Sequence, residues 1–185
     1  MGAGLIRAVG AGIVLALGAA VVPAHAAQPV VVAVDGTLCD LTKTLAAGAA
    51  SVTCLIPPGG DPHSYRLKPS DRSQIAKSDL VLHIGFGLTP SAKKLQSPGT
   101  VVAVGEVALP SYGGSDPHVW HDPANSAAMV RVISSSLAPV LPASDRAALQ
   151  QRTARAVAVL QALQSWEAKQ FSSLPPAQRV LVTDH

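Results

Sequence analysis

The sequence predicts an α/β protein: a lobe built on a mainly parallel four-stranded sheet with flanking helices, a long rigid linking helix, and the start of a second similar lobe. Short apolar runs alternate with helical segments along the first part of the chain, which is the order of a parallel sheet covered on both faces. Of the 185 residues 48% are hydrophobic but only 3% are aromatic, so the core must consist of Ala, Val, Leu and Ile.

Four short apolar runs are expected to form the strands of the sheet. They are Val30–Val34, Val52–Ile56, Leu80–Ile84 and Thr100–Val104. The first three end at turn residues such as Asp-Gly and Pro-Pro-Gly-Gly, which are typical strand terminators.

Helical segments follow these strands. The spacing predicts helices at Leu38–Ala47, at Ser70–Lys77 with Ser70 as N-cap, and at Leu88–Leu95. The stretch from Glu106 to Trp120 shows little regular pattern. A further helix is expected from Pro123 to Leu137, because Asp122 is a good N-cap and proline favours the first helical position.

A much longer helix is predicted from Ser144, its expected N-cap, to Phe171, with a length of roughly 40 Å at 1.5 Å per residue. Its apolar stripe consists of Leu149, Ala156, Leu160 and Leu163. Such a helix can act as a strut between two lobes. Pro175-Pro176 ends it and a new strand is expected at 180–182, so we divide the chain into a first lobe (27–142), the linking helix (143–174) and the start of a second lobe (175–185). The chain therefore looks truncated.

The first 26 residues are typical of a cleavable signal peptide. Arg7 precedes an apolar run from Ala8 to Val22, and Ala24-His25-Ala26 forms an A-x-A cleavage site. The alternative, a retained anchor, is disfavoured because this run is shorter than the roughly 20 residues that a spanning helix needs. The sequence thus predicts export to the periplasm.

Composition and motifs exclude several function classes. The formal net charge is +3, but Lys and Arg are scattered, so no nucleic-acid partner is expected. The chain has no P-loop, no dinucleotide fingerprint, no H-E-x-x-H and no G-x-S-x-G. We expect a monomer that is not an enzyme.

The only two cysteines are Cys39 and Cys54. Export favours a disulfide between them, because free thiols are unusual in an oxidising compartment. The alternative is that both are soft metal ligands.

A repeated Asp-Pro-His motif predicts a metal site. It places His63 after the second strand and His118 before the helix that starts at Pro123, each on a backbone stiffened by proline. His185, which follows a late apolar run, is the third candidate ligand. Three neutral imidazoles favour Zn²⁺ over Mn²⁺ or Mg²⁺ and leave one coordination position open. His83 is expected instead to be a core or helix-facing residue with its own hydrogen bonds satisfied.

Four segments together resemble a known family. Val52-Thr53-Cys54-Leu55-Ile56-Pro57-Pro58-Gly59-Gly60-Asp61-Pro62-His63-Ser64-Tyr65, Ser78-Asp79-Leu80-Val81-Leu82, Asp116-Pro117-His118-Val119-Trp120 and Val182-Thr183-Asp184-His185 are similar to the periplasmic metal-binding (solute-binding) component of zinc and manganese ABC importers, zinc-uptake type. The similarity covers nearly all of the mature chain.

The resemblance implies a two-lobed receptor that carries Zn²⁺, as a transported ligand, to an ABC permease of the inner membrane. His63 and His118 match the two ligands of the first lobe. His185 matches the third, which is histidine in zinc-type members and usually glutamate in manganese-type ones. The family's fourth, acidic ligand would lie beyond residue 185.

The sequence also departs from the family. The loop from Glu106 to Ser115 lacks the histidines that many zinc-type members carry there. His121 stands where the family usually has an apolar residue, and it is kept as a candidate for supporting a ligand histidine, since ligand histidines usually have such partners.

Two alternative functions stay open. One is a manganese receptor or adhesin on the same scaffold. The other is an exported zinc hydrolase, for which a general base would have to come from Asp61, Asp116, Asp122 or Asp184.

Overall fold

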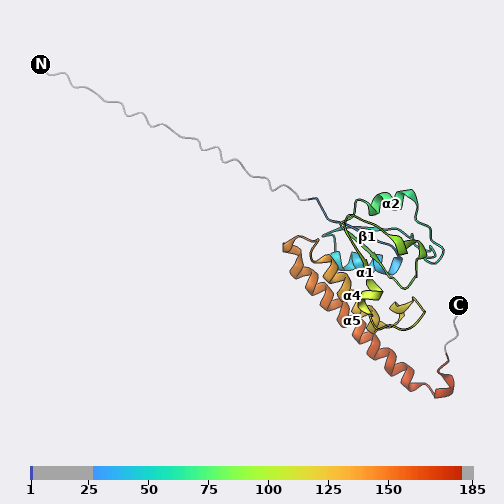
Figure 1. The fold of residues 1–185 in the computed structure, drawn as a ribbon. Helices are drawn as coiled ribbons and strands as arrows, with labels where there is room; N and C mark the ends of the chain where they lie inside the picture. The colour runs from blue at the N-terminus through green and yellow to red at the C-terminus, as the bar shows by residue number, and fades with distance from the viewer. Residues whose placement is uncertain (2–26, 181–185) are drawn as a thin grey trace.

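The computed structural model describes Met1 and residues 27–180, so the predicted signal peptide, His185 and most of the strand predicted at 180–182 lie outside the described residues. Within the described range four strands form one parallel sheet in the order β2-β1-β3-β4 (Figure 1). The strands are β1 (Val30–Ala33), β2 (Ser51–Cys54), β3 (Leu80–His83) and β4 (Thr100–Ala103). The predicted parallel sheet is confirmed.

The direction in which successive strands are added to the sheet changes at β1. The connection from β1 leads to β2 on one side, and the next strand, β3, pairs with β1 on its other side. In open α/β sheets the loops at the carboxyl ends of the strands on either side of such a reversal leave room for ligands. The segments that follow β1 and β3 therefore border the place where a ligand site is expected.

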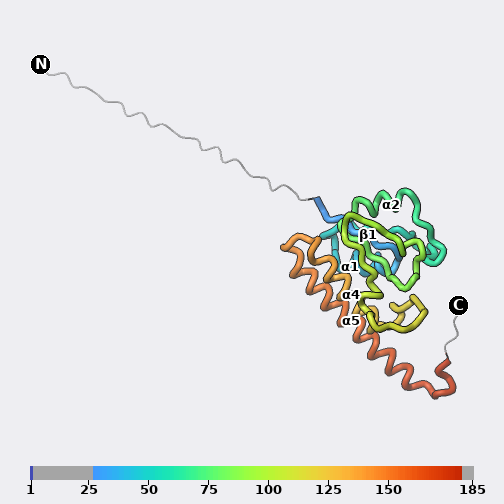
Figure 2. Tube along the Cα trace, in the orientation of Figure 1, coloured from blue at the N-terminus to red at the C-terminus, as the bar shows by residue number. Residues whose placement is uncertain are grey.

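Helices cover both faces of the sheet, and alternate strand residues serve the two faces. Val31 and Ala33 pack with α1 (Gly36–Ala46), α4 (Pro123–Leu137) and α5 (Arg146–Ser173) in the larger core. Val32 and Val34 pack against α2 (Pro69–Ile75) and η1 (Pro90–Lys94) in the smaller one. The tube trace in Figure 2 shows α4 and α5 side by side on the far side of the sheet from α2. The small aliphatic side chains predicted from composition are the ones that fill both cores.

Several element boundaries differ from the sequence expectation. α2 begins at Pro69, and its first turn is held by Asp71, whose Oδ2 accepts a hydrogen bond from Lys68 N at 2.8 Å. Ser70 is therefore not the N-cap. The helix expected at Leu88–Leu95 is a shorter 3-10 helix, η1. Conversely, α3 (Val104–Ala108) forms where only irregular structure was expected. Short 3-10 turns complete the described chain: η2 (Val119–His121), η3 (Ala143–Asp145) and η4 (Pro176–Gln178).

The long helix α5 has 28 residues, which corresponds to about 42 Å. Its N-cap is Asp145, without a side-chain cap bond, rather than Ser144. Leu149 and Val157 are buried on the lobe, but Leu163, part of the predicted stripe, is 40% exposed. The stripe fails there because the C-terminal half of α5 runs beyond the sheet lobe (Figure 1).

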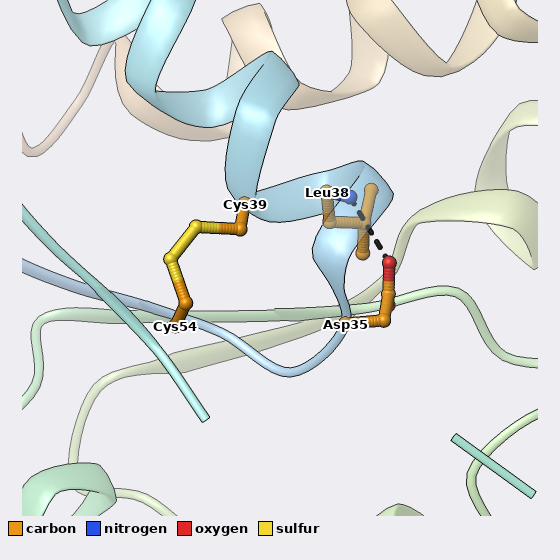
Figure 3. The surroundings of a disulfide bond; sticks show 4 residues. All are labelled: Asp35, Leu38, Cys39 and Cys54. Atoms are coloured by element: carbon orange, nitrogen blue, oxygen red, sulfur yellow. Dashed lines mark hydrogen bonds between the residues drawn. A yellow bond between two sulfur atoms is a disulfide. The ribbon is translucent and has the colours of Figure 1, made fainter. Parts of the chain in front are cut away.

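The predicted disulfide is confirmed. Cys39 of α1 is bonded to Cys54 at the end of β2 (Figure 3). Closing a loop with a sequence separation of 15 stabilises a fold by about 3 kcal/mol in the chain-entropy model. The bond ties the edge strand β2, which leads into the His63 loop, to the helix beneath it. In residues 27–180 no helix combines the length and the apolar character needed to cross a membrane.

Candidate metal centre

His63 lies in the loop that follows β2. The carboxylate of Asp61 accepts a hydrogen bond from His63 N at 2.9 Å, which closes an Asx turn across the intervening proline. The pKa of Asp61 lies below its usual range, chiefly because Ser64 hydrogen-bonds its carboxylate and then because of the His63 amide. The His63 side chain itself is exposed.

Tyr65 fixes the rest of this loop. Its hydroxyl lies 2.9 Å from Asp71 Oδ2 and 3.0 Å from Leu55 O, and its carbonyl accepts a hydrogen bond from Ser91 Oγ at 2.8 Å. Burial, followed by the contact with Asp71, raises the pKa of the Tyr65 phenol. The loop is thereby tied to β2, α2 and η1 within two residues of His63.

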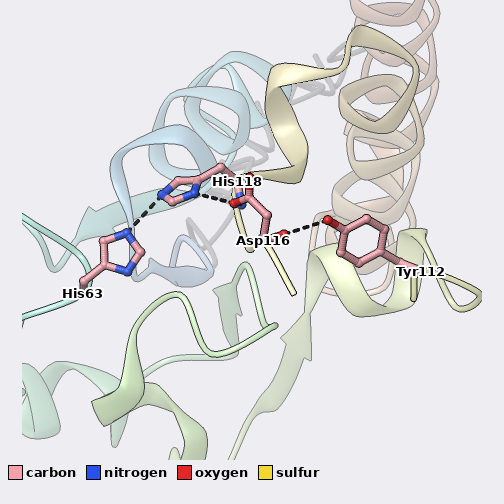
Figure 4. A network of polar contacts seen from close by, with 4 residues as sticks. All are labelled: His63, Tyr112, Asp116 and His118. Carbon is pink, nitrogen blue, oxygen red and sulfur yellow. Dashed lines mark hydrogen bonds and ion pairs between the residues drawn. The ribbon is translucent and has the colours of Figure 1, made fainter. Parts of the chain in front are cut away.

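His118 is held by a second Asx turn of the same form. Asp116 Oδ1 accepts a hydrogen bond from His118 N at 2.9 Å and also contacts His118 Nδ1 at 2.6 Å. The carbonyl of Asp116 in turn accepts a hydrogen bond from the Tyr112 hydroxyl at 2.9 Å (Figure 4). The His118 side chain is only 16% exposed. Asp116 therefore orients both the backbone and the imidazole ring of His118.

The two imidazoles converge on one point. His63 Nε2 and His118 Nε2 are 3.0 Å apart and their ring centroids are 5.0 Å apart, beside an open hollow of about 560 Å³ that they line with Asp116 and Pro117 (Figure 4). Two nitrogens bound to one tetrahedral zinc at about 2.0–2.1 Å would lie about 3.3 Å apart, with centroids about 5 Å apart. The observed pair therefore fits a zinc ion with a shift of a few tenths of an ångström.

The carboxylate contact decides which nitrogen of His118 faces the hollow. With Nδ1–H donating to Asp116, Nε2 carries a lone pair, so the proton between the rings belongs to His63 Nε2. A zinc ion bound by both Nε2 atoms, lying to one side of the line that joins them, would take the place of that proton. Ligand histidines in proteins are commonly held by a carboxylate at the other ring nitrogen in this way.

Two aromatic neighbours complete the surroundings of His118. The Trp120 ring meets the His118 ring nearly edge-on at a centroid distance of 5.3 Å, and the His121 ring lies 5.5 Å from Trp120. His121 precedes Asp122, the N-cap of α4, as the sequence predicted. The centroids of His121 and His118 are 6.4 Å apart, and no hydrogen bond joins the two side chains.

His83 is not part of this pair, and its partial burial agrees with the expected core-facing position. It is partly buried at the end of β3 and lines a separate cavity of about 150 Å³ with Thr89, Lys93 and Glu106. Burial lowers the pKa of its imidazole, which the charge of Glu106 partly offsets. Its imidazole makes no hydrogen bond to another side chain or backbone group in the range 27–180, so the expectation that its hydrogen bonds are satisfied stays a prediction. The cavity leaves the ring next to open space.

Asp35 is a buried carboxylate that the sequence did not single out as a candidate site residue. It is 5% exposed and lies two residues after the end of β1, at the strand reversal. It caps α1 through Oδ1, which accepts a hydrogen bond from Leu38 N at 3.0 Å (Figure 3). Its Oδ2 has no hydrogen-bond partner among the described residues. Burial raises the pKa of Asp35 to about 6 against the backbone hydrogen bonds that lower it. The available signal was an Asp ending a fully apolar run.

Within residues 27–180, no three His, Cys, Asp or Glu side chains lie close enough together to hold a metal ion. The described residues thus include two of the three predicted ligands, His63 and His118. The third, His185, lies outside the described residues. Cys39 and Cys54 are bonded to each other and are not available as ligands.

Taken together, the parallel α/β lobe and the converging imidazoles at the ends of its loops indicate a metal-binding α/β protein. Comparison with known proteins then gives the family. Residues 31–185 match the model of the periplasmic zinc-uptake complex component A, ZnuA, and the chain belongs to this family.

Several characterised relatives are similar over most of the chain. The zinc-binding protein TroA of Treponema pallidum is 33% identical over 172 residues, covering 88% of this chain and 56% of TroA. The manganese-binding lipoprotein MntA of Halalkalibacterium halodurans is 33% identical over 151 residues, covering 77% of this chain and 50% of MntA. This chain therefore spans about half the length of these relatives.

Solved structures agree with the fold. The periplasmic zinc-binding protein TroA superposes with a TM-score of 0.78 at 30% identity, covering 85% of this chain and 60% of TroA. Fe(III)-bound YtgA from Chlamydia trachomatis gives a TM-score of 0.74 at 26% identity, covering 83% and 57%. The named metals of these relatives are zinc, manganese and iron, so the comparisons indicate a metal ion without choosing one.

Proposed function

We propose that this protein is a periplasmic high-affinity zinc-binding receptor that delivers Zn²⁺ to an ABC-type permease of the inner membrane. The observation that carries the proposal is the convergence of His63 Nε2 and His118 Nε2 to 3.0 Å, in a chain of the zinc-uptake family. The family consists of metal-binding transport receptors rather than enzymes. Zn²⁺ is the cargo here, not a resident cofactor.

The choice of zinc rests on ligand chemistry. The two converging donors are imidazole nitrogens, which suit zinc, whereas manganese prefers carboxylate and water oxygens. Oδ1 of the neighbouring carboxylate, Asp116, already accepts a hydrogen bond from His118 N and contacts His118 Nδ1. It acts as a support for the imidazole in this proposal and not as a ligand or as the general base of a hydrolase.

The proposal includes the predicted organisation of the chain. Residues 1–26 are removed as a signal peptide, 27–142 form the lobe that captures the ion, 143–174 form the linking helix, and 175–185 open a second lobe that supplies His185 as third ligand. The receptor acts as a monomer without nucleic-acid partners. Because the imidazoles must be neutral to bind the ion, zinc affinity should fall as the pH is lowered.

A second candidate function is a manganese receptor on the same scaffold. It is favoured by one observation, the 33% identity to a manganese-binding lipoprotein, which equals the identity to the zinc-binding TroA. The two candidates differ in a measurable preference and not in the position of the site.

A competitive titration with Zn²⁺ and Mn²⁺ against a chelating dye separates them. The zinc proposal predicts one tightly bound ion per chain and a preference for zinc. Preference for Mn²⁺ under the same conditions would establish the second candidate, and absence of binding of either ion would overturn both.

A further inference from the structure

His121 lies beside the histidine pair and has no part in the two-histidine site described above. It belongs to a 3-10 turn in which His121 N donates to His118 O at 3.3 Å. His118 is the N-cap of this turn, and the centroids of the His118 and His121 rings are 6.4 Å apart. The H-x-x-H spacing thus puts a third imidazole next to the candidate site.

The ring distances say how close this third imidazole comes. The centroids of His118 and His121 are 6.4 Å apart, whereas two imidazoles on one tetrahedral zinc need about 5 Å. His121 must therefore approach by roughly 1–1.5 Å before it can share an ion with His118. As placed, the three rings do not form a site, in agreement with the absence of a three-ligand cluster in residues 27–180.

Of the two imidazoles, that of His121 is the one placed to make this approach. The His121 side chain is exposed, and exposed side chains exchange rotamers within nanoseconds. His118, in contrast, is 16% exposed and is fixed by Asp116 and by the edge of Trp120. His118 is thus the rigid partner, and the half-buried Trp120 ring, 5.5 Å from His121, keeps the mobile imidazole near it.

We propose that His121 is an auxiliary zinc ligand of the first lobe, which swings onto an ion already held by His63 and His118 before the ligand of the second lobe replaces it. The inference rests on the proposed zinc-receptor function. It explains how a lobe with two converging ligands can hold the ion during capture, because a third nitrogen brings the coordination closer to the four that zinc prefers.

The direct test is the ring ¹⁵N spectrum of the histidines in the purified chain, recorded with and without one equivalent of Zn²⁺. The proposal predicts zinc-dependent shifts at the ring nitrogens of His63, His118 and His121. Unchanged His121 signals alongside shifted His63 and His118 signals would overturn it.

A matched set of variants gives the energetic test. In the His63→Ala background the lobe keeps His118 and His121 as ligands, so adding His121→Leu should weaken zinc binding at least about tenfold further, the lower end of what loss of a group around a metal costs. His83→Leu in the same background serves as the control, because His83 lines a different cavity. Equal zinc affinities with and without His121 would refute the inference.

His118→Ala separates this inference from the proposed function. If His118→Ala abolishes zinc binding while removal of His121 changes nothing, only the auxiliary ligand is refuted. If His118→Ala leaves zinc affinity unchanged, the proposed function itself fails.

Discussion

The two Asp-Pro-His loops share their backbone but differ in how they hold the imidazole. In both, the aspartate accepts a hydrogen bond from the histidine N at 2.9 Å. Asp116 also reaches the ring of its own histidine at 2.6 Å, whereas Asp61 is hydrogen-bonded by Ser64. One motif has thus produced a preorganised histidine, His118, and an exposed one, His63.

The difference follows from what surrounds each loop. His118 leads into η2 and α4 and packs against Trp120, so its ring is partly covered and has a fixed carboxylate partner. His63 lies in the loop after the edge strand β2, where Tyr65 and the Cys39–Cys54 disulfide anchor the backbone but the ring stays exposed. We infer that His118 sets the position of the ion and that His63 adapts to it.

The largest expected effect comes from removing the fixed histidine. His118→Ala should lower zinc affinity by more than the roughly 100-fold upper range for loss of a supporting group, since a ligand itself is lost. A competitive chelator titration measures this, with His83→Ala as the control. His63→Ala should cost less than His118→Ala. Equal losses would show that the two loops do not differ in function.

The two aspartates offer the sharpest comparison. Asp116→Asn replaces the charged partner of the His118 ring and should weaken zinc binding about 10–100-fold. Asp61→Asn keeps the Asx turn and touches no imidazole, so the change in affinity should stay within about threefold, well below that range. The same titration applied to both variants decides the matter. A larger loss for Asp61→Asn would reverse the roles assigned to the loops.

Asp35→Asn tests the buried carboxyl at the start of α1. Burial raises its folded pKa from 3.8 to about 6, so the folded state holds the proton more tightly than the unfolded state. Stability should therefore fall as the pH rises from about 4 to about 6 and stay low above that, with ionisation costing about 3 kcal/mol at pH 7.

Asparagine also caps helices well. Its NH₂ group, however, would take the place of Oδ2, which has no hydrogen-bond partner among the described residues, and burying this unpaired donor costs about 1–2 kcal/mol. The net expectation is a gain of about 1–2 kcal/mol in the free energy of unfolding at pH 7 and no gain below about pH 4. Urea unfolding at the two pH values measures it. A gain that is the same at both would contradict the assigned cause.

The smallest effects are expected from the tyrosines that pin the two loops. Tyr112→Phe removes the hydrogen bond to Asp116 O and should cost about 1 kcal/mol of stability, with a two- to threefold loss of zinc affinity because Asp116 positions His118. Tyr65→Phe should cost similar stability but leave zinc affinity unchanged. Thermal unfolding measures the stability and the chelator titration measures the zinc affinity of both variants. A loss of zinc affinity in Tyr65→Phe but not in Tyr112→Phe would contradict this prediction.

The sequence was most informative where a local pattern of residues is compatible with only one secondary structure. Apolar runs between turn residues predicted all four strands to within two residues at each end, and Asp122-Pro123 predicted the start of α4. It was less informative where a tertiary contact decides. The start of α2 at Pro69 has a local signal, proline at the first helical position with Asp71 in the first turn, but the hydrogen bond between Asp71 and the Tyr65 hydroxyl is a contact that no local pattern reveals.

What the sequence determined by itself is the set of candidate ligands and their backbone, since the Asp-Pro-His turn needs only residues adjacent in the chain. That the two Nε2 atoms meet at 3.0 Å across 55 residues was decided by the tertiary structure alone. The strand order β2-β1-β3-β4 and the packing of α4 bring the loops together, and these depend on contacts between distant residues. The same holds for the raised pKa of Asp35, because burial is a property of the folded neighbours and not of the residue.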